Sequence, residues 1–572
     1  MAQDYRPDRD SSAFSGQTGV NRLRGRVFEW VTLAATAFGL VMVTVLLAYV
    51  FTDAVRPFTA DAGWYLVYAA TVFAPAGALL AYYYRTPEPA GDVALSATGL
   101  PVVGLVAGAA IAVLFIEVAT PADWFGLVVA VLLAGAVVVA HQRLRPTAAL
   151  ERLLVVALAP VLTVVGIPAL AVDVALTSPY TATEILTIAF ATPELLSSVG
   201  AFVRPVVSPV PGWLLLVTSL TLPAAVLFGR VVVRRRDDGR GLPETVAGAV
   251  VLTTAAPVAA PLVGLAALHW VVLATAAVLP TAVYLERVLR RRSGLLGLLF
   301  PVALAVGVAA GAVLTDAFGF AGPASWLDWS FLTSPTSITP EKAGIYPPLV
   351  GSVLMLLVIV ALVFPAGVGA AIYLEEYAPD SGPAGRLVSL VEINVGNLAG
   401  VPSVVYGLLG LALFVKGIGL ETGIVLVGGL TVGLLVLPIV IISSMEAIRA
   451  VPDSLRQASD GMGATRWQTI RCVVLPQALP GILTGTILAL GRAIGETAPL
   501  LMIGAAASVR LAPNGFFDKF SAMPRQIFAW SSEFDPDFRF GVLAAGVVTL
   551  LAVLLLLNGT AIVIRNKYQQ RD

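Results

Sequence analysis

The most regular feature of the chain is a series of long apolar runs separated by short polar segments. A helix that crosses a membrane needs about 20 mostly apolar residues, and the sequence holds about fourteen such runs. The pattern therefore predicts an all-α, polytopic integral membrane protein. The predicted spans lie near residues 27–51, 63–84, 96–116, 123–140, 150–172, 211–229, 244–266, 270–287, 295–316, 348–374, 388–415, 422–445, 480–506 and 540–563.

Composition supports this reading and excludes other classes. Of 572 residues, 58% are hydrophobic and 12% are charged, whereas a soluble chain has about 25% charged residues. A soluble enzyme, a disordered chain and a nucleic-acid-binding protein are excluded, and a lipid bilayer is the expected surrounding. The single cysteine, Cys472, excludes an internal disulfide. His141 and His269 stand far apart in the sequence, which argues against a histidine metal centre.

Basic residues predict the orientation of the spans. Cytoplasmic loops carry an excess of Lys and Arg, and arginine clusters recur at every second loop, as at Arg234–Arg236 and Arg290–Arg292. The segment 507–539 departs from the alternation, because it also holds basic residues. We expect a multi-pass protein of the cell membrane with both termini cytoplasmic. The polar tail and the long first run read as an anchor and not as a cleaved signal peptide.

The chain divides at the basic cluster that ends near residue 292. Residues 1–24 are predicted to be a cytoplasmic tail. The N-terminal region, residues 25–290, holds about eight spans dominated by Ala, Val, Leu and Gly, and we expect an accessory packing role there. The C-terminal region, residues 291–572, places polar, Gly and Pro residues inside its apolar runs. Charged groups at membrane depth are costly, so function is expected in this region.

The first feature of the C-terminal region is the segment 446–479, called the docking loop below. Asp453 is predicted to cap a short helix that Gly461 and Gly463 end. Thr465 and Gln468 have capping-box spacing for a second short helix, expected to end at Leu475–Pro476. A compact projection of this kind suits a groove on a partner protein. The alternative is a loop in the headgroup layer, where Trp467 is equally at home.

The second feature is a charged pair inside the last-but-one span. Arg492 and Glu496 are four residues apart and are predicted to share one helix face. They form either a structural salt bridge or an anion site, since guanidinium binds tetrahedral oxyanions through two parallel hydrogen bonds. Glu496 suits an anion that can donate a hydrogen bond, as phosphate does near neutral pH and sulfate does not. Thr497 adds a hydroxyl donor.

The third feature is an interrupted span at residues 391–410. Gly400 and Pro402 break the apolar run, with Asn397 and Ser403 on either side. The half-helix after Pro402 would expose amide donors at its positive end, which is a suitable anion site. Broken spans are good pointers to transport sites. The alternative is a packing kink.

The docking loop resembles the "EAA" signature of ABC-importer permeases. The signature is Glu-Ala-Ala, three residues, Gly, nine residues and Ile-x-Leu-Pro. It falls on Gln457, Ala458, Ser459, Gly463, Val473, Leu475 and Pro476 with the spacing intact. The family's coupling helix seats in a cleft of the ATP-hydrolysing subunit, which favours the docking interpretation. Gln457 replaces a glutamate, so a salt bridge to the partner is not implied here. The docking set that we assign is Glu446, Gln457, Ala458, Ser459, Gly463, Trp467, Leu475 and Pro476.

Residues 291–572 as a whole resemble the PstA-type permeases of phosphate ABC transporters. The resemblance rests on the two membrane strings around Arg492 and Pro402, on the outside loop that ends at Ala343–Gly351, and on the order of the six spans. It implies a six-helix ABC-importer permease bundle that takes up phosphate. The N-terminal region departs from the compact family member.

The implied partners are a second permease of the PstC type, ATPase subunits of the PstB type and an extracytoplasmic phosphate-binding protein of the PstS type. The chain holds no GxxxxGK[ST] phosphate cradle, so we expect a transport subunit that is not an enzyme. No cofactor is expected in this chain, because ATP is used by the partner. Sulfate, molybdate and phosphonate are the alternative substrates. A secondary transporter would need several acidic residues at membrane depth, and Glu496 is the strongest candidate for such a residue.

Overall fold

A computed structural model of the chain describes residues 22–86, 89–115, 119–145, 149–164, 166–167, 170–177, 184–193, 196–235, 241–262, 264–379 and 381–569. The described chain is built almost wholly of helices, several of which contain a wide π-helical turn.

The elements of the N-terminal region are α1 (Arg22–Val55), α2 (Ala62–Tyr68), η2 (Ala69–Phe73), α3 (Ala74–Arg85), α4 (Ala90–Val113), α5 (Pro121–Leu144), α6 (Ala149–Val164), β1 (Leu170–Thr177), β2 (Glu184–Thr192), α7 (Val199–Val207), α8 (Gly212–Leu216), η4 (Val217–Thr221), α9 (Leu222–Val233), α10 (Gly241–Thr254), α11 (Ala256–Leu262), α12 (Ala267–Leu273), η5 (Ala274–Val278) and α13 (Leu279–Arg291).

The elements of the C-terminal region are η6 (Leu295–Leu298), α14 (Leu299–Phe318), α15 (Trp329–Thr333), α16 (Tyr346–Val358), η8 (Ile359–Val363), α17 (Phe364–Ile372), η9 (Tyr373–Tyr377), α18 (Gly382–Ala399), α19 (Ser403–Gly410), η10 (Leu411–Gly417), α20 (Val425–Arg449), α21 (Asp453–Gly461), α22 (Arg466–Thr469), η11 (Ile470–Val474), α23 (Leu475–Ile494), α24 (Ala498–Met502), α25 (Met523–Ser531), η12 (Asp537–Val542) and α26 (Leu543–Gln569).

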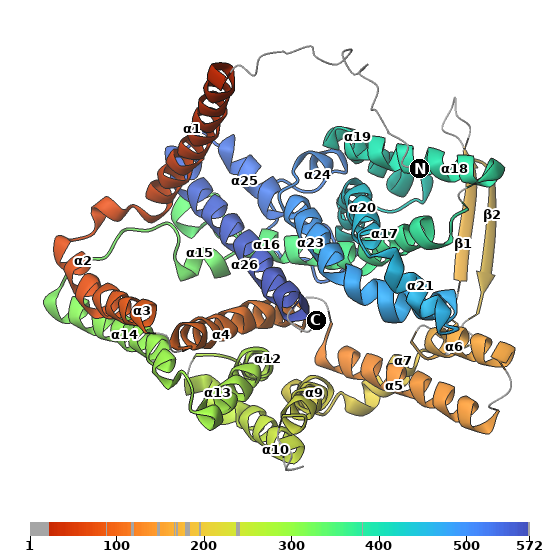
Figure 1. Cartoon of the computed structure of the whole chain (residues 1–572), viewed down its shortest axis with the longest axis horizontal. Helices are drawn as coiled ribbons and strands as arrows, with labels where there is room; N and C mark the ends of the chain where they lie inside the picture. Colours follow the sequence, from red (N-terminus) through yellow and green to blue (C-terminus); the bar gives the residue numbers. More distant parts are fainter. Residues whose placement is uncertain are drawn as a thin grey trace, which may run out of the picture.

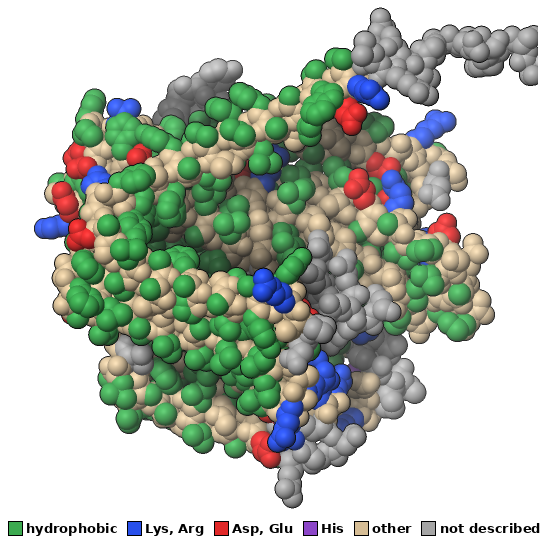
Figure 2. All heavy atoms as spheres, turned by 60° about the vertical axis from the view of Figure 1, so that its left-hand side comes forward, with side chains coloured by type: hydrophobic (Ala, Val, Ile, Leu, Met, Phe, Trp, Pro, Cys, Tyr) green, Lys and Arg blue, Asp and Glu red, His purple; other side chains and the backbone are tan. Residues whose placement is uncertain are grey.

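Most spans agree with the apolar pattern, but the predicted span 480–506 is shifted, because the helix there runs from Arg466 to Ile494. Among the described residues, 11 helices are long and apolar enough to cross a membrane, or 13 if the two bent pairs α10–α11 and α18–α19 each count as one span. The helical, multi-pass class predicted from the sequence is confirmed. Figure 2 agrees, because hydrophobic side chains cover much of the face it shows, while charged side chains lie mostly near its margins.

The remaining predicted span, 150–172, takes a different form. Helix α6 ends at Val164, and Gly166 turns the chain with a φ of +74°. Strand β1 then begins at Leu170 and pairs with β2 in an antiparallel hairpin in which Leu170 lies opposite Thr192. The strand segments are rich in Val, Ile and Thr, which favour extended backbone. Apolar content alone therefore predicted a helix where β-branched residues form a hairpin.

The core of the C-terminal region surrounds α20. Helices α16, α17, α19 and α23 all pack against it, and its buried side chains join one large apolar cluster. Three glycines of α20 permit this close approach. A Cβ added to Gly428, Gly429 or Gly433 would lie 2.4–2.6 Å from Phe520, Val358 or Val363 respectively. Small residues at such positions let membrane helices meet closely.

The N-terminal region borders the C-terminal region on more than one side, since its hairpin β1–β2 stands at the right edge of Figure 1. In Figure 1 its helices run along the left and lower edges, and α1 lies beside α26. The Arg56 guanidinium forms an ion pair of 3.3 Å with Asp537 and sits 4.8 Å from the ring centroid of Trp326. Helix α14, the first span of the C-terminal region, packs against α2, α3 and α4. The sequence boundary near residue 292 is thus crossed by extensive packing.

Candidate substrate path and docking loop

The charged pair lies at the end of a helix and not within one. Helix α23 ends at Ile494, with Gly495 as its cap, and α24 begins at Ala498. The Nε of Arg492 donates to the Glu496 carboxylate at 3.1 Å. The prediction that both residues share one helix face is therefore wrong, because Glu496 lies beyond the last helical turn. Pro499 contributes to the break, since it lacks the backbone amide that would donate to the Gly495 carbonyl if α23 continued.

The pair is placed so that the guanidinium can take a further ligand. The Arg492 side chain is 44% exposed, whereas Glu496 is 15% exposed. Among the residues that the structure describes, no hydrogen bond uses the two terminal nitrogens of Arg492. Those two nitrogens form the fork that binds an oxyanion in a bidentate manner. Thr497, half-buried, follows directly and occupies the N-cap position of α24.

The predicted break near Pro402 is present. Helix α18 ends at Ala399, Pro402 precedes α19, and the two helices bend by 110°. Asn397, Gly400 and Pro402 are exposed and Ser403 is half-buried. The first amides of a helix have no partner within it, and the Ser403 and Val404 amides at the start of α19 are candidate donors next to these side chains. The Val405 amide already donates to the Pro402 carbonyl at 3.0 Å.

The two interruptions are neighbours in space. Helix α19 packs against α24, and a Cβ added to Gly407 would lie 2.7 Å from Cβ of Met502. Tyr406, which sequence analysis did not single out, is buried, and its hydroxyl donates to the Leu398 carbonyl at 2.8 Å across the bend. The structure therefore brings together two sequence features that lie about ninety residues apart.

The docking loop is a compact, two-helix projection between α20 and α23. The capping box is confirmed, because Gln468 accepts from the Thr465 amide at 2.8 Å and the Thr465 hydroxyl accepts from the Gln468 amide at 3.4 Å. Helix α21 ends at Gly461, and Gly463 has a φ of +79°. The hydroxyls of Ser459 and Thr469 meet at 2.8 Å in the buried contact between α21 and α22.

Two details of the predicted loop are wrong. Asp453 does not cap α21; Pro452 holds the cap position, and the Asp453 carboxylate accepts from Arg456 at 3.0 Å instead. Leu475–Pro476 does not end the second helix, because α22 continues through η11 into α23. The wide π turn at Ile470–Val474 accommodates Pro476, which cannot donate a backbone hydrogen bond.

The predicted docking residues differ in exposure. Glu446, Gln457, Ala458, Gly463 and Pro476 are exposed, and Trp467 is 54% exposed. Leu475 is half-buried. Ser459 is buried and holds the two helices of the loop together, so it faces the interior of the loop. An outward surface that combines an indole ring with small residues suits contact with another protein.

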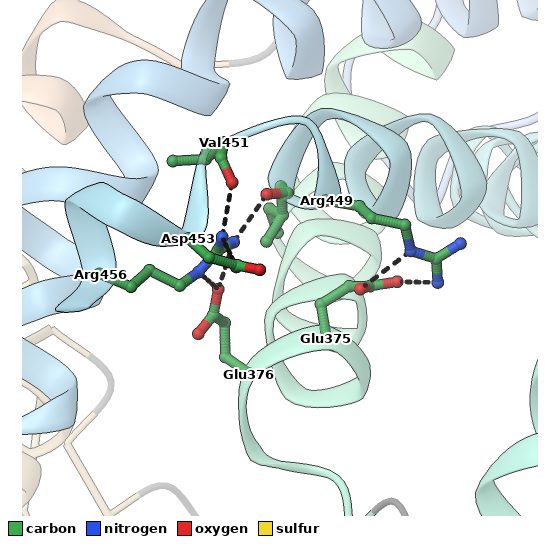
Figure 3. A network of polar contacts seen from close by, with 7 residues as sticks. Glu375, Glu376, Arg449, Val451, Asp453 and Arg456 are labelled. Atoms are coloured by element: carbon green, nitrogen blue, oxygen red, sulfur yellow. Dashed lines mark hydrogen bonds and ion pairs between the residues drawn. The ribbon is translucent and has the colours of Figure 1, made fainter. Parts of the chain in front are cut away.

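A network of ion pairs attaches the loop to the helix that ends at Tyr377 (Figure 3). Arg456 donates to Glu376 at 3.1 Å and to the carbonyls of Ile448 and Val451 at 2.9 and 2.6 Å. Arg449 binds Glu375 through two nitrogens, at 2.5 and 3.3 Å. Neither glutamate was among the residues predicted from the sequence. The sequence did carry a signal. Glu375 and Glu376 lie at the end of a predicted span, on the same side of the membrane as Arg449 and Arg456 in the predicted topology.

The fold and these sites define a membrane transport protein. Its helices cross the bilayer many times, two spans break at adjacent points, and a compact two-helix projection lies at the opposite end of the helix that carries Arg492. Residues 367–567 match the family model described as "Binding-protein-dependent transport system inner membrane component". The matched segment contains both breaks and the whole docking loop.

Curated relatives agree with this match. The chain is 35% identical over 188 residues to "Probable ABC transporter permease protein YqgI" of Bacillus subtilis, which covers 33% of this chain and 62% of the relative. It is 34% identical over 233 residues to "Phosphate transport system permease protein PstA 1" of Mycobacterium tuberculosis, which covers 40% of this chain and 73% of the relative.

A third relative belongs to a different permease type. The chain is 33% identical over 202 residues to "Phosphate transport system permease protein PstC" of Mesorhizobium japonicum, which covers 30% of this chain and 59% of the relative. The chain thus spans less than two thirds of two of these three relatives. It belongs to the family of binding-protein-dependent transport system inner membrane components, and PstA-type permeases are among the relatives that it matches.

Proposed function

We propose that this chain is a transmembrane permease subunit of an ATP-driven importer of inorganic phosphate. The observation that carries the proposal is the Arg492–Glu496 pair at the junction of two broken spans. Arg492 keeps its two terminal nitrogens for a ligand, and the candidate donor amides at the start of α19 belong to the neighbouring interruption. The relative named as a phosphate transport permease supports the choice of substrate.

The geometry favours phosphate over sulfate. An anion on the terminal nitrogens of Arg492 comes close to the Glu496 carboxylate, which would repel it unless the anion donates a hydrogen bond. Phosphate retains a proton near neutral pH and can donate that bond, while sulfate cannot. Glu496 then acts as a selectivity group, and Arg492 supplies the attractive charge.

Energy for transport comes from separate ATPase subunits in this proposal. They bind the exposed face of the docking loop on the cytoplasmic side, where both termini of the chain also lie. A second permease of the PstC type completes the path, and an extracytoplasmic binding protein of the PstS type delivers phosphate. ATPase closure moves the bundle because it binds one arrangement of the loop more tightly than the other.

The test is ATP-dependent uptake of radiolabelled phosphate into vesicles that contain the full assembly, with sulfate as competitor. Arg492→Ala should reduce uptake to background while the assembly still forms. Arg492→Lys separates the alternatives, because it preserves the charge beside Glu496 but loses the bidentate fork. Uptake should fall in this variant as well.

The control is Arg290→Ala, which breaks a comparable i,i+4 pair with Glu286 outside the path, and it should transport normally. Normal uptake by Arg492→Lys would make the pair a structural salt bridge. Sulfate that displaces phosphate efficiently would overturn the proposed substrate, and absence of uptake by the wild-type assembly would overturn the function.

A further inference from the structure

The docking loop is attached by ion pairs to the helix that ends at Tyr377. This helix runs without a break from Tyr346 to Tyr377 as one candidate span. Its last turn, η9, carries Glu375 and Glu376, which pair with Arg449 and Arg456 of the docking loop (Figure 3). The guanidinium of Arg466, in α22, also lies 5.5 Å from the ring centroid of Tyr377. Contacts from both helices of the loop therefore converge on one turn.

Arg456 is the centre of this attachment. Its guanidinium joins three elements at once: the carbonyls of Ile448 and Val451 at the end of α20, Asp453 at the start of α21, and Glu376 in η9. A cation at a helix C-terminus is favourable because it satisfies the last carbonyls and opposes the helix dipole. Arg456 thus fixes the angle between α20 and α21 and ties that angle to the third helix.

Burial distinguishes this contact from its neighbour. The side chains of Glu376 and Arg456 are 8% and 21% exposed, whereas Glu375 and Arg449 are 12% and 64% exposed. Breaking a buried pair leaves an uncompensated charge, so the two groups must stay together as the helices move. A pair with an arginine in solvent is screened and exchanges readily with water.

Resting on the proposed function, we propose that Glu376 and Arg456 are positioning residues that make the Tyr346–Tyr377 span move as one body with α21. When the ATPase subunits displace the loop, the displacement then reaches three spans: α20 and α23 through the backbone, and the Tyr346–Tyr377 helix through this ion pair. Helix α16, at the far end of that span, packs against α20 and α25. The ion pair thereby links the loop to the opposite end of the bundle.

The first experiment measures phosphate imported per ATP hydrolysed by the full assembly in vesicles. Glu376→Gln preserves shape and removes the charge. It should retain ATPase association and hydrolysis within twofold of wild type, while imported phosphate per ATP falls at least tenfold. Glu376→Asp restores the charge and should recover part of the ratio. Glu375→Gln is the matched control on the same turn and should keep the wild-type ratio.

The outcomes separate this proposal from simpler ones. If association, hydrolysis and uptake all fall in parallel with the amount of folded permease, the pair is only structural and the proposal is overturned. If Glu376→Gln imports phosphate at the wild-type ratio, the proposal fails while the proposed function stands. If the wild-type assembly imports no phosphate, the proposed function fails instead.

A second experiment measures the movement directly. Cys472 is exposed, so it is first replaced by serine, and spin labels are then placed at Ser454 in α21 and at Tyr373 in η9, which are both exposed. In the wild-type background the distance between labels should stay constant when a non-hydrolysable ATP analogue closes the ATPase. It should change in Glu376→Gln. A wild-type distance that changes on closure would overturn the proposal.

Discussion

The two regions of the molecule solve the problem of packing helices in a membrane differently. In the N-terminal region, helices meet at small residues: a Cβ on Gly104 would lie 2.4 Å from Cα of Ala277, and one on Gly126 would lie 3.0 Å from Cα of Gly200. In the C-terminal region, the same kind of contact is combined with the sharper of the two bends, 110° against 60°, and with the charged pairs Arg492–Glu496 and Arg456–Glu376. Close packing alone builds a scaffold, while function requires interruptions that expose polar groups.

The largest effect of a substitution is expected at the docking loop. Gly463→Val places a β-branched residue at a φ of +79°, where nothing lies within 4 Å of the added Cβ. The cost of about 1–2 kcal/mol is therefore one of backbone conformation, and it should reshape the outward face of the loop. We expect ATPase association to weaken about tenfold or more, measured by co-purification, while the permease remains folded.

Gly461→Ala is the control, because Gly461 is helical and its surroundings are equally open. It should preserve association. Unchanged co-purification of the ATPase with Gly463→Val would argue strongly against the docking assignment.

A pair of glycine substitutions sharpens the contrast between scaffold and path. Gly407→Leu forces α19 away from Met502 and Pro499, and Gly104→Leu forces α4 away from Ala276 and Ala277. Each should destabilise the protein by about 1–3 kcal/mol through overpacking. Phosphate uptake, normalised to folded protein, should fall severalfold only in Gly407→Leu. Equal loss of uptake in both would remove the functional distinction between the regions.

The smallest effect is expected where the two regions meet near α1. Arg56→Ala removes the ion pair with Asp537 and the contact with the Trp326 ring, and both Arg56 and Asp537 are largely exposed. Loss of about 0.5–1 kcal/mol should follow, visible as a small decrease in melting temperature. Uptake should not change. If uptake instead fell strongly, the N-terminal region would have a direct part in transport.

Much of the architecture was readable from local pattern. The length of the apolar runs predicted all but one of the spans. Gly400 and Pro402 predicted the bend between α18 and α19, and the spacing of Thr465 and Gln468 predicted the capping box. These features depend on neighbouring residues. The hairpin after Val164 was missed because apolar content does not distinguish a β-branched strand from a buried helix.

The candidate sites needed tertiary information in addition. Arg492 and Glu496 were found by residue type, but their placement across a helix end depends on Gly495 and Pro499 together. Tyr406 donates a hydrogen bond to Leu398, and Arg456 donates one to Glu376. In both cases the two residues are close because of how the helices pack. A single sequence carries no periodic signal for such contacts.

The uninterrupted helix from Arg466 to Ile494 has a mechanical consequence. At 1.5 Å per residue, its 29 residues form a rod about 44 Å long, with the docking loop at one end and Arg492 at the other. In a helix of that length, a small tilt at one end moves the other end by a large distance. A tilt of about 5° at the docking loop shifts the end that carries Arg492 by about 4 Å. That is more than a hydrogen-bond length, enough for a modest rotation at the inner surface to release an anion from its guanidinium.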